Sequence, residues 1–155
     1  MIEFFDVDIN YINYLKQYES KIPNIEYNNS NKFICGVVQK INDLNYYAPI
    51  SSKTSPQRTS LLIYDNQRVI SSIKFAFMFP VPDDALAIKN ISQIRLVDSS
   101  YADLLQMEYS FCNSHENEII RKAQSVYRYG TNPNHHLFNC CCNFTLLEEK
   151  YNLYI

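Results

Sequence analysis

Apolar residues near the start of the chain recur at helical spacing. Within residues 8–18 they are Tyr11, Ile12, Leu15 and Tyr18, which fall on one face of a helix. Asp8 or Asn10 can cap this segment at its amino end, and Pro23 prevents a helix from continuing past it. We therefore predict a helix over residues 8–18 and a loop over the turn-forming residues 24–31.

The next two apolar segments are typical of paired strands. Residues 33–41 are rich in β-branched and apolar side chains, Asp43 lies in a turn, and residues 46–50 return as a second strand. This pattern predicts an antiparallel hairpin. The polar residues 51–60 then form a loop.

Two further strands are predicted after that loop. They cover residues 61–64 and 72–79 and are separated by a turn at residues 65–67. Pro80 and Pro82 confine the end of the second strand to an edge of the sheet or an exit from it.

The second half of the chain has helical patterns instead. We expect helices over residues 100–112 and 115–129 and a short terminal helix over 143–151, with Asn143 as its N-cap and Ser114 as an approximate capping signal for the helix before it. Strands gather in the first half and helices in the second. The fold class is therefore α+β, a small twisted antiparallel sheet or half-barrel packed by helices.

Length and composition indicate one globular domain spanning residues 1–155, with 46% apolar and 19% charged residues. No apolar stretch approaches the roughly 20 residues that span a bilayer. The amino terminus has neither a basic region nor a cleavable apolar stretch, as a secretory signal would. We expect a soluble, cytoplasmic protein with no membrane partner.

Glycine and cysteine usage excludes several kinds of site. Gly36 and Gly130 are the only two glycines, which excludes dinucleotide fingerprints and phosphate loops. The five cysteines include the contiguous residues 140–142, which favours reduced thiols over a disulfide framework. Together with His135 and His136 they are candidate metal ligands, but they lack the paired spacing of a zinc site. We expect small buried hydrophobes there and no metal or other cofactor.

Charge is unevenly spread along the chain. Residues 29–95 carry a net charge of +4, whereas residues 1–28 and 96–155 carry −3 each. Residues 44–64 contain no carboxylate. A basic middle segment is a candidate surface for a polyanion; the alternative is an ordinary fluctuation of surface charge.

The densest polar cluster directly follows the second strand of the hairpin. It consists of Ser51, Ser52, Lys53, Thr54 and Ser55, with Gln57, Arg58 and Thr59 behind it. Hydroxyls and backbone amides beside a lysine can bind phosphate without glycine. The alternative is a plain connecting loop.

The predicted hairpin brings a second polar cluster to the same place. Its open end sets residue 32 beside residue 51, so Tyr27, Asn31 and Lys32 face the Ser51–Lys53 segment. This arrangement suits the cleavage of RNA, which carries its own nucleophile in the 2′-hydroxyl. Such a reaction needs a proton acceptor, cations around the phosphorane and a donor to the 5′-oxygen, but neither a metal nor a covalent protein intermediate.

At these residues the sequence resembles the type III toxin–antitoxin endoribonucleases of the ToxN, AbiQ and CptN group. The resemblance runs nearly from end to end, and the order and spacing of the segments come closest to the CptN-like members. The segments are Tyr11–Lys16, Ile22–Asn24, Phe33–Val38, Tyr47–Ser52, Ile73–Pro80 and, most distinctively, Cys142–Tyr151.

The resemblance implies a fold and an activity. The fold is a compact, highly curved antiparallel sheet, SH3-like as in the MazF and Kid toxins, decorated with helices. The activity is sequence-selective, metal-independent RNA cleavage that halts growth or aborts phage infection. The antitoxin is an RNA of tandem repeats, which the toxin cuts into pseudoknot units and then binds in a closed assembly, expected to hold three toxins and three RNAs.

The resemblance also assigns roles by position. The loop tyrosine falls on Tyr27, the hydroxyl pair on Ser51 and Ser52, and the lysine after that pair on Lys53, without the proline that usually precedes it. The family lysine before the first hairpin strand falls on Asn31. Either Lys32 replaces it with a reshaped loop, since one residue changes the face of a strand, or Lys53 acts alone. Further RNA contacts are expected from Asn31, Lys32, Thr54, Ser55, Arg58 and Lys74.

Two other functions remain open from the residues alone. A non-catalytic RNA-binding module could use some of the 13 tyrosines and nine phenylalanines for stacking, although such aromatics also form cores. A protein-interaction domain would show no salt-dependent affinity for RNA.

Overall fold

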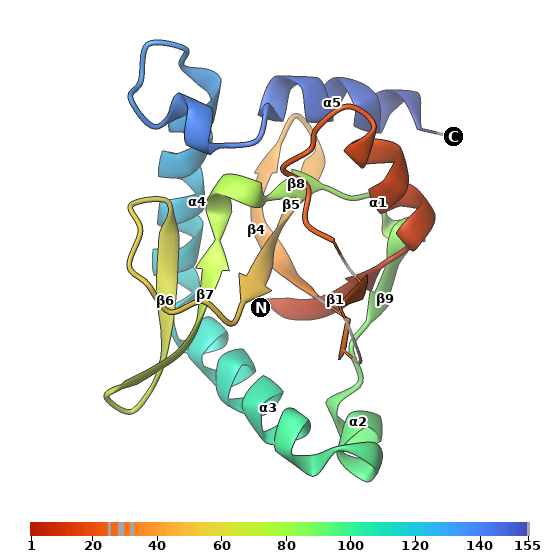
Figure 1. Cartoon of the computed structure of the whole chain (residues 1–155), viewed down its shortest axis with the longest axis vertical. Helices are drawn as coiled ribbons and strands as arrows, with labels where there is room; N and C mark the ends of the chain where they lie inside the picture. Colours follow the sequence, from red (N-terminus) through yellow and green to blue (C-terminus); the bar gives the residue numbers. More distant parts are fainter. Residues whose placement is uncertain (25, 28–29, 32, 155) are drawn as a thin grey trace.

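A curved antiparallel sheet lies at the centre of the molecule, with helices around it (Figure 1). The computed structural model describes residues 1–24, 26–27, 30–31 and 33–154, with the backbone alone at 26, 27, 30 and 31. The strand order is β6-β7-β5-β4-β1-β9, with β8 also paired to β5. The strands are β1 (Glu3–Val7), β4 (Ile34–Ile41), β5 (Leu44–Ser51), β6 (Ser60–Asp65), β7 (Arg68–Lys74), β8 (Phe79–Pro80) and β9 (Leu86–Ile88).

The predicted hairpin is confirmed as β4 and β5. Its turn residues Asn42 and Asp43 have φ values of 50° and 65°, the conformation that tight two-residue hairpin loops require. Gly36 on β4 lies against Tyr47, and a Cβ at this glycine would come within 2.5 Å of the Tyr47 ring. Only glycine fits this close approach without a shift of the ring.

The strand predicted over residues 72–79 is wrong in its second half. The chain leaves the sheet after Lys74, makes a 3-10 turn at η1 (Phe75–Phe77), and rejoins β5 through β8. Phe75, Met78 and Phe79 are all fully buried. An apolar run of this kind does not distinguish a strand from another buried conformation, which explains the error.

The loop predicted over residues 24–31 is only partly correct. Two-residue strands β2 (Glu26–Tyr27) and β3 (Ser30–Asn31) pair there in a separate small sheet.

The predicted helices are confirmed as α1 (Ile9–Lys16), α3 (Ser99–Ser114), α4 (Glu116–Thr131) and α5 (Phe144–Leu153). Asp8 caps α1 and Asn143 caps α5 through their side chains. The Ser114 signal is wrong, because the residue before α4 is His115, which makes no side-chain capping bond. Two 3-10 turns are also present, η2 (Asp83–Ala85) and η3 (Phe138–Cys140).

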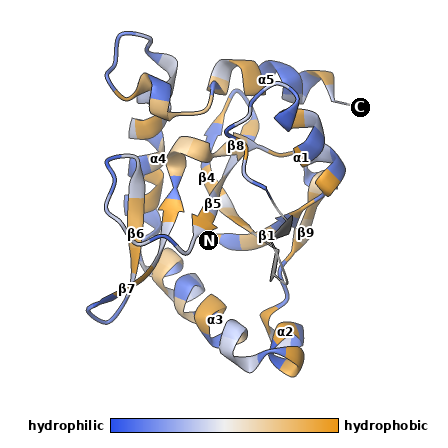
Figure 2. Ribbon diagram, in the orientation of Figure 1, coloured by the Kyte–Doolittle hydropathy of each residue, from blue (hydrophilic) through white to orange (hydrophobic). Residues whose placement is uncertain are grey.

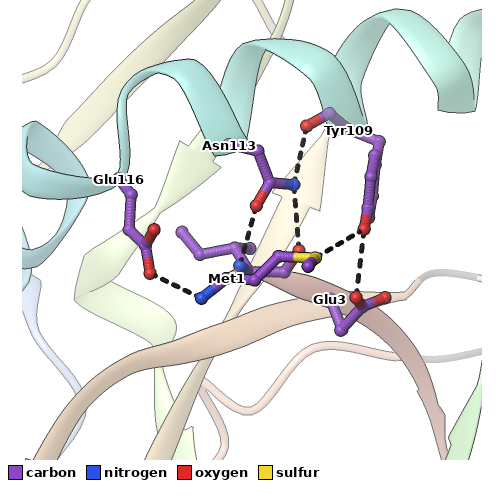
Figure 3. A network of polar contacts seen from close by, with 6 residues as sticks. Met1, Glu3, Tyr109, Asn113 and Glu116 are labelled. Atoms are coloured by element: carbon purple, nitrogen blue, oxygen red, sulfur yellow. Dashed lines mark hydrogen bonds and ion pairs between the residues drawn. The ribbon is translucent and has the colours of Figure 1, made fainter.

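The sequence analysis also did not predict β1, β9 or α2 (Ile91–Val97). Of these, β1 lies inside the sheet between β4 and β9. Its amino end is held by α3, where Asn113 exchanges two hydrogen bonds with the backbone of Ile2, both 3.0 Å long. The terminal ammonium of Met1 pairs with Glu116 at 3.0 Å (Figure 3).

The α+β class is confirmed, with β6 and β9 as open edges of the sheet rather than partners in a closed barrel. In the part of the chain that the structure describes, no helix has the length and apolar character to cross a membrane.

Candidate functional site

The backbone of Lys53 is held in place by serines from two neighbouring strands. Ser51, at the end of β5, lies opposite Ser72 on β7. The Ser51 Oγ accepts a hydrogen bond from the Lys53 amide at 3.2 Å, and the Ser72 hydroxyl donates to the Lys53 carbonyl at 2.6 Å. Both polar groups of the Lys53 peptide are therefore satisfied by side chains, and the exposed Lys53 side chain extends from a fixed point.

A second lysine lies beside this point. Lys74, the last residue of β7, is only 6% exposed, and its Nζ donates to Gln57 Oε1 at 3.2 Å. Burial, together with the positive charge of Lys53, lowers the pKa of Lys74. These two neighbouring lysines, with Lys53 in the segment 44–64 that contains no carboxylate, create a positive potential suited to an anion.

The two strands of the hairpin stay paired as far as residues 33 and 50. The Ile50 amide donates to the Phe33 carbonyl at 3.3 Å, so residue 33 lies beside the residue that precedes Ser51. Tyr27 belongs to β2 and Asn31 to β3, where the structure describes the backbone alone. Lys32 lies outside the described residues. The roles expected of these three side chains stay predictions.

The rest of the polar loop is open to solvent. Ser52, Thr54, Ser55 and Arg58 are exposed, whereas Thr59 and Ser60 are buried where β6 begins. Arg58 turns toward the loop that follows α4, and its Nη1 lies 3.1 Å from Nε2 of His136. Figure 2 shows both loops in the blue of hydrophilic residues.

The three contiguous cysteines differ in exposure. Cys141 and Cys142 are buried, Cys140 is exposed, and all five cysteines are free. Burial raises the pKa of the Cys141 thiol to about 11, and burial with the nearby Glu19 carboxylate raises that of Cys142 still further. Among the described residues, no group of three or more His, Cys, Asp or Glu could hold a metal ion.

Two residues of the site were missed in the sequence. The sequence pattern predicts only that Ser72 lies in a strand and that Gln57 lies in the polar loop. A signal for Ser72 exists, since Ser71-Ser72 interrupts an otherwise apolar strand with two buried hydroxyls. The partner of Gln57 depends on the register of β6 and β7, which pairs Ser60 with Lys74 and which hydrophobic periodicity does not give.

The comparison that decides the family covers almost the whole chain. Residues 3–152 match the family described as "Toxin ToxN, type III toxin-antitoxin system". The chain belongs to this ToxN toxin family. The family membership expected from the resemblance is thereby confirmed.

Named relatives of this ToxN family member agree with the match. Endoribonuclease ToxN of Bacillus thuringiensis subsp. kurstaki is 29% identical over 98% of this chain and 84% of its own length. Endoribonuclease AbiQ of Lactococcus lactis subsp. lactis is 27% identical over 99% of this chain and 89% of its own.

Solved structures show the same fold. A type III toxin studied for its selective inhibition by a non-coding RNA pseudoknot superposes with a TM-score of 0.91, at 28% identity over 99% of this chain and 97% of that one. AbiQ, described as a lactococcal anti-phage endoribonuclease, gives a TM-score of 0.88 at 28% identity, over 99% and 98% of the two chains.

Proposed function

We propose that this ToxN family member is an endoribonuclease toxin that cuts RNA at selected sequences and is inhibited by an RNA antitoxin. Its relatives carry the name endoribonuclease. The observation that carries the proposal is the exposed Lys53, whose backbone is held by Ser51 and Ser72 beside the buried cation of Lys74. A cation fixed before the substrate arrives is what stabilisation of developing charge requires.

The proposed reaction needs no group beyond the RNA and the protein. The ribose 2′-oxygen attacks the adjacent phosphorus and loses its proton, while the bond from phosphorus to the 5′-oxygen breaks and that oxygen gains a proton. The products carry a 2′,3′-cyclic phosphate and a 5′-hydroxyl. Negative charge gathers on the phosphorane between these steps, so donors placed around it lower the barrier.

The described residues suit distinct parts of this reaction. The Lys53 ammonium binds the phosphate, and the exposed Ser52 hydroxyl donates to one of its oxygens. The Ser51 hydroxyl oxygen accepts a hydrogen bond from the Lys53 amide, so the hydroxyl can still donate a hydrogen bond to the substrate. Thr54 helps to orient the phosphate. Lys74 is nearly buried, so we assign it an effect through its charge rather than a direct RNA contact.

The remaining roles rest on family membership. Tyr27 is proposed to act at the ribose, with Asn31 or Lys32 on the other side of the substrate and Ser55 and Arg58 along the strand of RNA. The curved sheet is proposed to be the counterpart of the SH3-like sheets of the MazF and Kid toxins. Action on RNA implies a cytoplasmic location.

The antitoxin is proposed to be a pseudoknot RNA cut from a repeat precursor by the toxin itself. One relative of known structure was studied for inhibition by such an RNA. We further propose a closed assembly of three toxins and three RNAs. Native mass spectrometry of the toxin co-expressed with its repeat RNA measures this ratio, and any other ratio contradicts the stoichiometry alone.

The test of the activity compares variants of the same chain. Purified Lys53→Ala and Ser52→Ala are expected to cleave RNA at least about 100-fold more slowly than the unmodified chain, the usual effect of removing one charge-stabilising donor. Their expression is expected to leave growth unaffected. Lys40→Ala is the matched control, because Lys40 is an exposed lysine near the other end of the β4–β5 hairpin.

The end groups of the products separate an enzyme from a binding module. Multiple turnovers with 2′,3′-cyclic phosphate ends support the proposal. RNA that is retarded on a gel but stays intact, or equal cleavage by all variants, would contradict it.

A further inference from the structure

Three planar side chains form a ladder beside the loop that holds Lys53. Tyr129, in the last turn of α4, stacks on His135 with ring centroids 4.2 Å apart and an angle of 12°. His135 stacks in turn on His136, at 4.6 Å and 24°. His136 is exposed at the end of the ladder, where its outer face can take one more planar group.

Hydrogen bonds hold the backbone and the ring of His135 at the centre of the ladder. The His135 amide donates to the Asn132 carbonyl, and the His135 carbonyl accepts from Phe138, both at 3.0 Å. The Leu137 amide donates to Nδ1 of His135 at 3.1 Å. A platform that is ordered before binding loses little conformational entropy when a ligand arrives.

One ring nitrogen of each histidine faces a hydrogen-bond donor. Arg58 has only N–H donors, so Nε2 of His136, 3.1 Å away, must accept. Nδ1 of His135 likewise accepts from Leu137. Partial burial, with smaller effects of His136 and Arg58, lowers the pKa of His135. The cluster therefore combines the guanidinium of Arg58 with stacked planar faces.

We propose that His136, supported by His135 and Tyr129, is a stacking platform for an unpaired base of the RNA next to the cleavage site, and that Arg58 binds the adjoining phosphate. Planar side chains accept any base, because every base has a π-face. The guanidinium has five donors, so it can hold His136 and a phosphate oxygen together.

The distance from the cleavage loop fits this role. Arg58 lies five residues after Lys53 in the sequence, and an extended chain spans at most about 3.6 Å per residue, or about 18 Å here. At about 3.4 Å per stacked nucleotide, the backbone of Arg58 lies no more than about five nucleotides from the backbone of Lys53. The inference rests on the proposed RNA cleavage and adds a subsite to it.

The test measures RNA affinity in protein that carries Lys53→Ala, so that the probe stays intact. The probe is a fluorescein-labelled oligoadenylate of about 12 nucleotides, within the range of single-strand site sizes, followed by fluorescence anisotropy. His136→Ala is expected to raise the Kd about 10-fold, as loss of one stacked base does. His136→Phe keeps a planar ring and is expected to stay within about 2-fold of the parent.

Arg58→Ala tests the phosphate contact separately. It is expected to weaken binding and to reduce the slope of log K against log salt by about 0.7, the value for one phosphate on a single strand. The matched controls are His115→Ala, a histidine stacked on Phe111 at the junction of α3 and α4, and Arg95→Ala, whose guanidinium pairs with Asp103. Neither is expected to change the affinity.

The outcomes separate the subsite from the activity. If His136→Ala binds the probe as tightly as its parent, or if His136→Phe binds as weakly as His136→Ala, the platform is overturned while the cleavage proposal stands. If the unmodified chain neither cleaves nor binds RNA, both proposals fall together. Thermal unfolding of each variant checks that the fold is intact.

Discussion

Glu108 is a buried carboxyl on the inner face of α3, with 2% of its surface exposed. Its Oε2 accepts a hydrogen bond from Ser71 Oγ at 2.6 Å, and its Oε1 has no partner among the described residues. Burial raises the pKa of Glu108 to about 7, although the Ser71 hydroxyl partly opposes this shift. Ser71 and Ser72 point to opposite faces of β7, so one strand carries the candidate site on one face and this carboxyl on the other.

The raised pKa predicts that the protein loses stability as the pH rises. Between the unfolded pKa of about 4.3 and the folded pKa of about 7, the folded state binds more protons than the unfolded state. The free energy of unfolding therefore falls across this window. Glu108→Gln has no proton to lose and should be more stable than the unmodified chain at pH 8, by up to about 4 kcal/mol.

Urea unfolding between pH 5 and pH 8 measures this difference. The two proteins should have similar stability at pH 5 and should diverge toward pH 8. Parallel curves over the whole range would show that Glu108 does not titrate in this window. Asp103→Asn is the matched control, because Asp103 lies on the same helix but is exposed.

Single residues also show how far a sequence can locate a site. Ser51, Ser52 and Lys53 are contiguous and follow a strand, so composition and local order suffice to single them out. Ser72 and Lys74 join them only because β7 pairs with β5. That pairing of strands cannot be predicted from the distribution of charge or from the spacing of hydrophobic residues.

At the scale of elements, α5 is fixed to the sheet by one carboxylate. Glu148 Oε2 accepts hydrogen bonds from the hydroxyls of Tyr46 on β5, at 2.6 Å, and Tyr127 on α4, at 2.7 Å. Burial and this carboxylate raise the pKa of both tyrosines, so both phenols stay protonated and can donate. The segment most distinctive of the family, residues 142–151, thus contains the residue that joins three elements.

Removal of this carboxylate should destabilise the fold. Glu148→Ala leaves two phenol donors without their acceptor, and hydrogen bonds to charged groups contribute about 1.5–3 kcal/mol each. We expect a loss of about 3 kcal/mol, which lowers Tm by roughly 6–12 °C for a chain of this length. Differential scanning calorimetry measures the shift. Glu149→Ala is the control, because Glu149 is the exposed neighbour, and an equal shift in both variants would contradict the assignment.

Gly130 permits the contact between α4 and α5. A Cβ at this position would lie 2.3 Å from the ring of Phe144, which is fully buried. Although alanine favours helices more than glycine does, Gly130→Ala should therefore destabilise the protein by about 1–3 kcal/mol through overpacking. The double variant Gly130→Ala with Phe144→Leu should recover part of the loss in chemical denaturation. Greater stability of the single alanine variant would refute the packing argument.

Elements with strong local signals could be predicted, and those without them could not. Short stretches of sequence are enough to predict the β4–β5 turn, the caps of α1 and α5, and the apolar faces of α3 and α4. In contrast, β9 has three residues and pairs only along β1, and α2 has no buried residue. β9 depends on its pairing with β1, from a distant part of the chain, and α2 depends on its packing against the neighbouring helix α3.

At the scale of the whole molecule, the amino terminus is hydrogen-bonded to the carboxyl-terminal half of α3. β1 lies between β4 and β9, so displacement of this strand would break the sheet in two. Asn113 makes three hydrogen bonds, two to the backbone of Ile2 and one from its Nδ2 to the Tyr109 carbonyl, each 3.0 Å long. Tyr109 also donates to Glu3 at 3.0 Å (Figure 3).

This connection predicts that Asn113 contributes to global stability without affecting the candidate RNA site. Asn113→Ala removes three hydrogen bonds of about 0.5–1.5 kcal/mol each, so we expect a loss of about 2–3 kcal/mol and a Tm lower by roughly 4–12 °C. Asn117→Ala, at an exposed position on α4, should leave Tm unchanged. Below the transition, Asn113→Ala should cleave RNA at the unmodified rate, because Asn113 and Lys53 share no bonded partner. Loss of cleavage without loss of stability would mean that the end of β1 acts on the site itself.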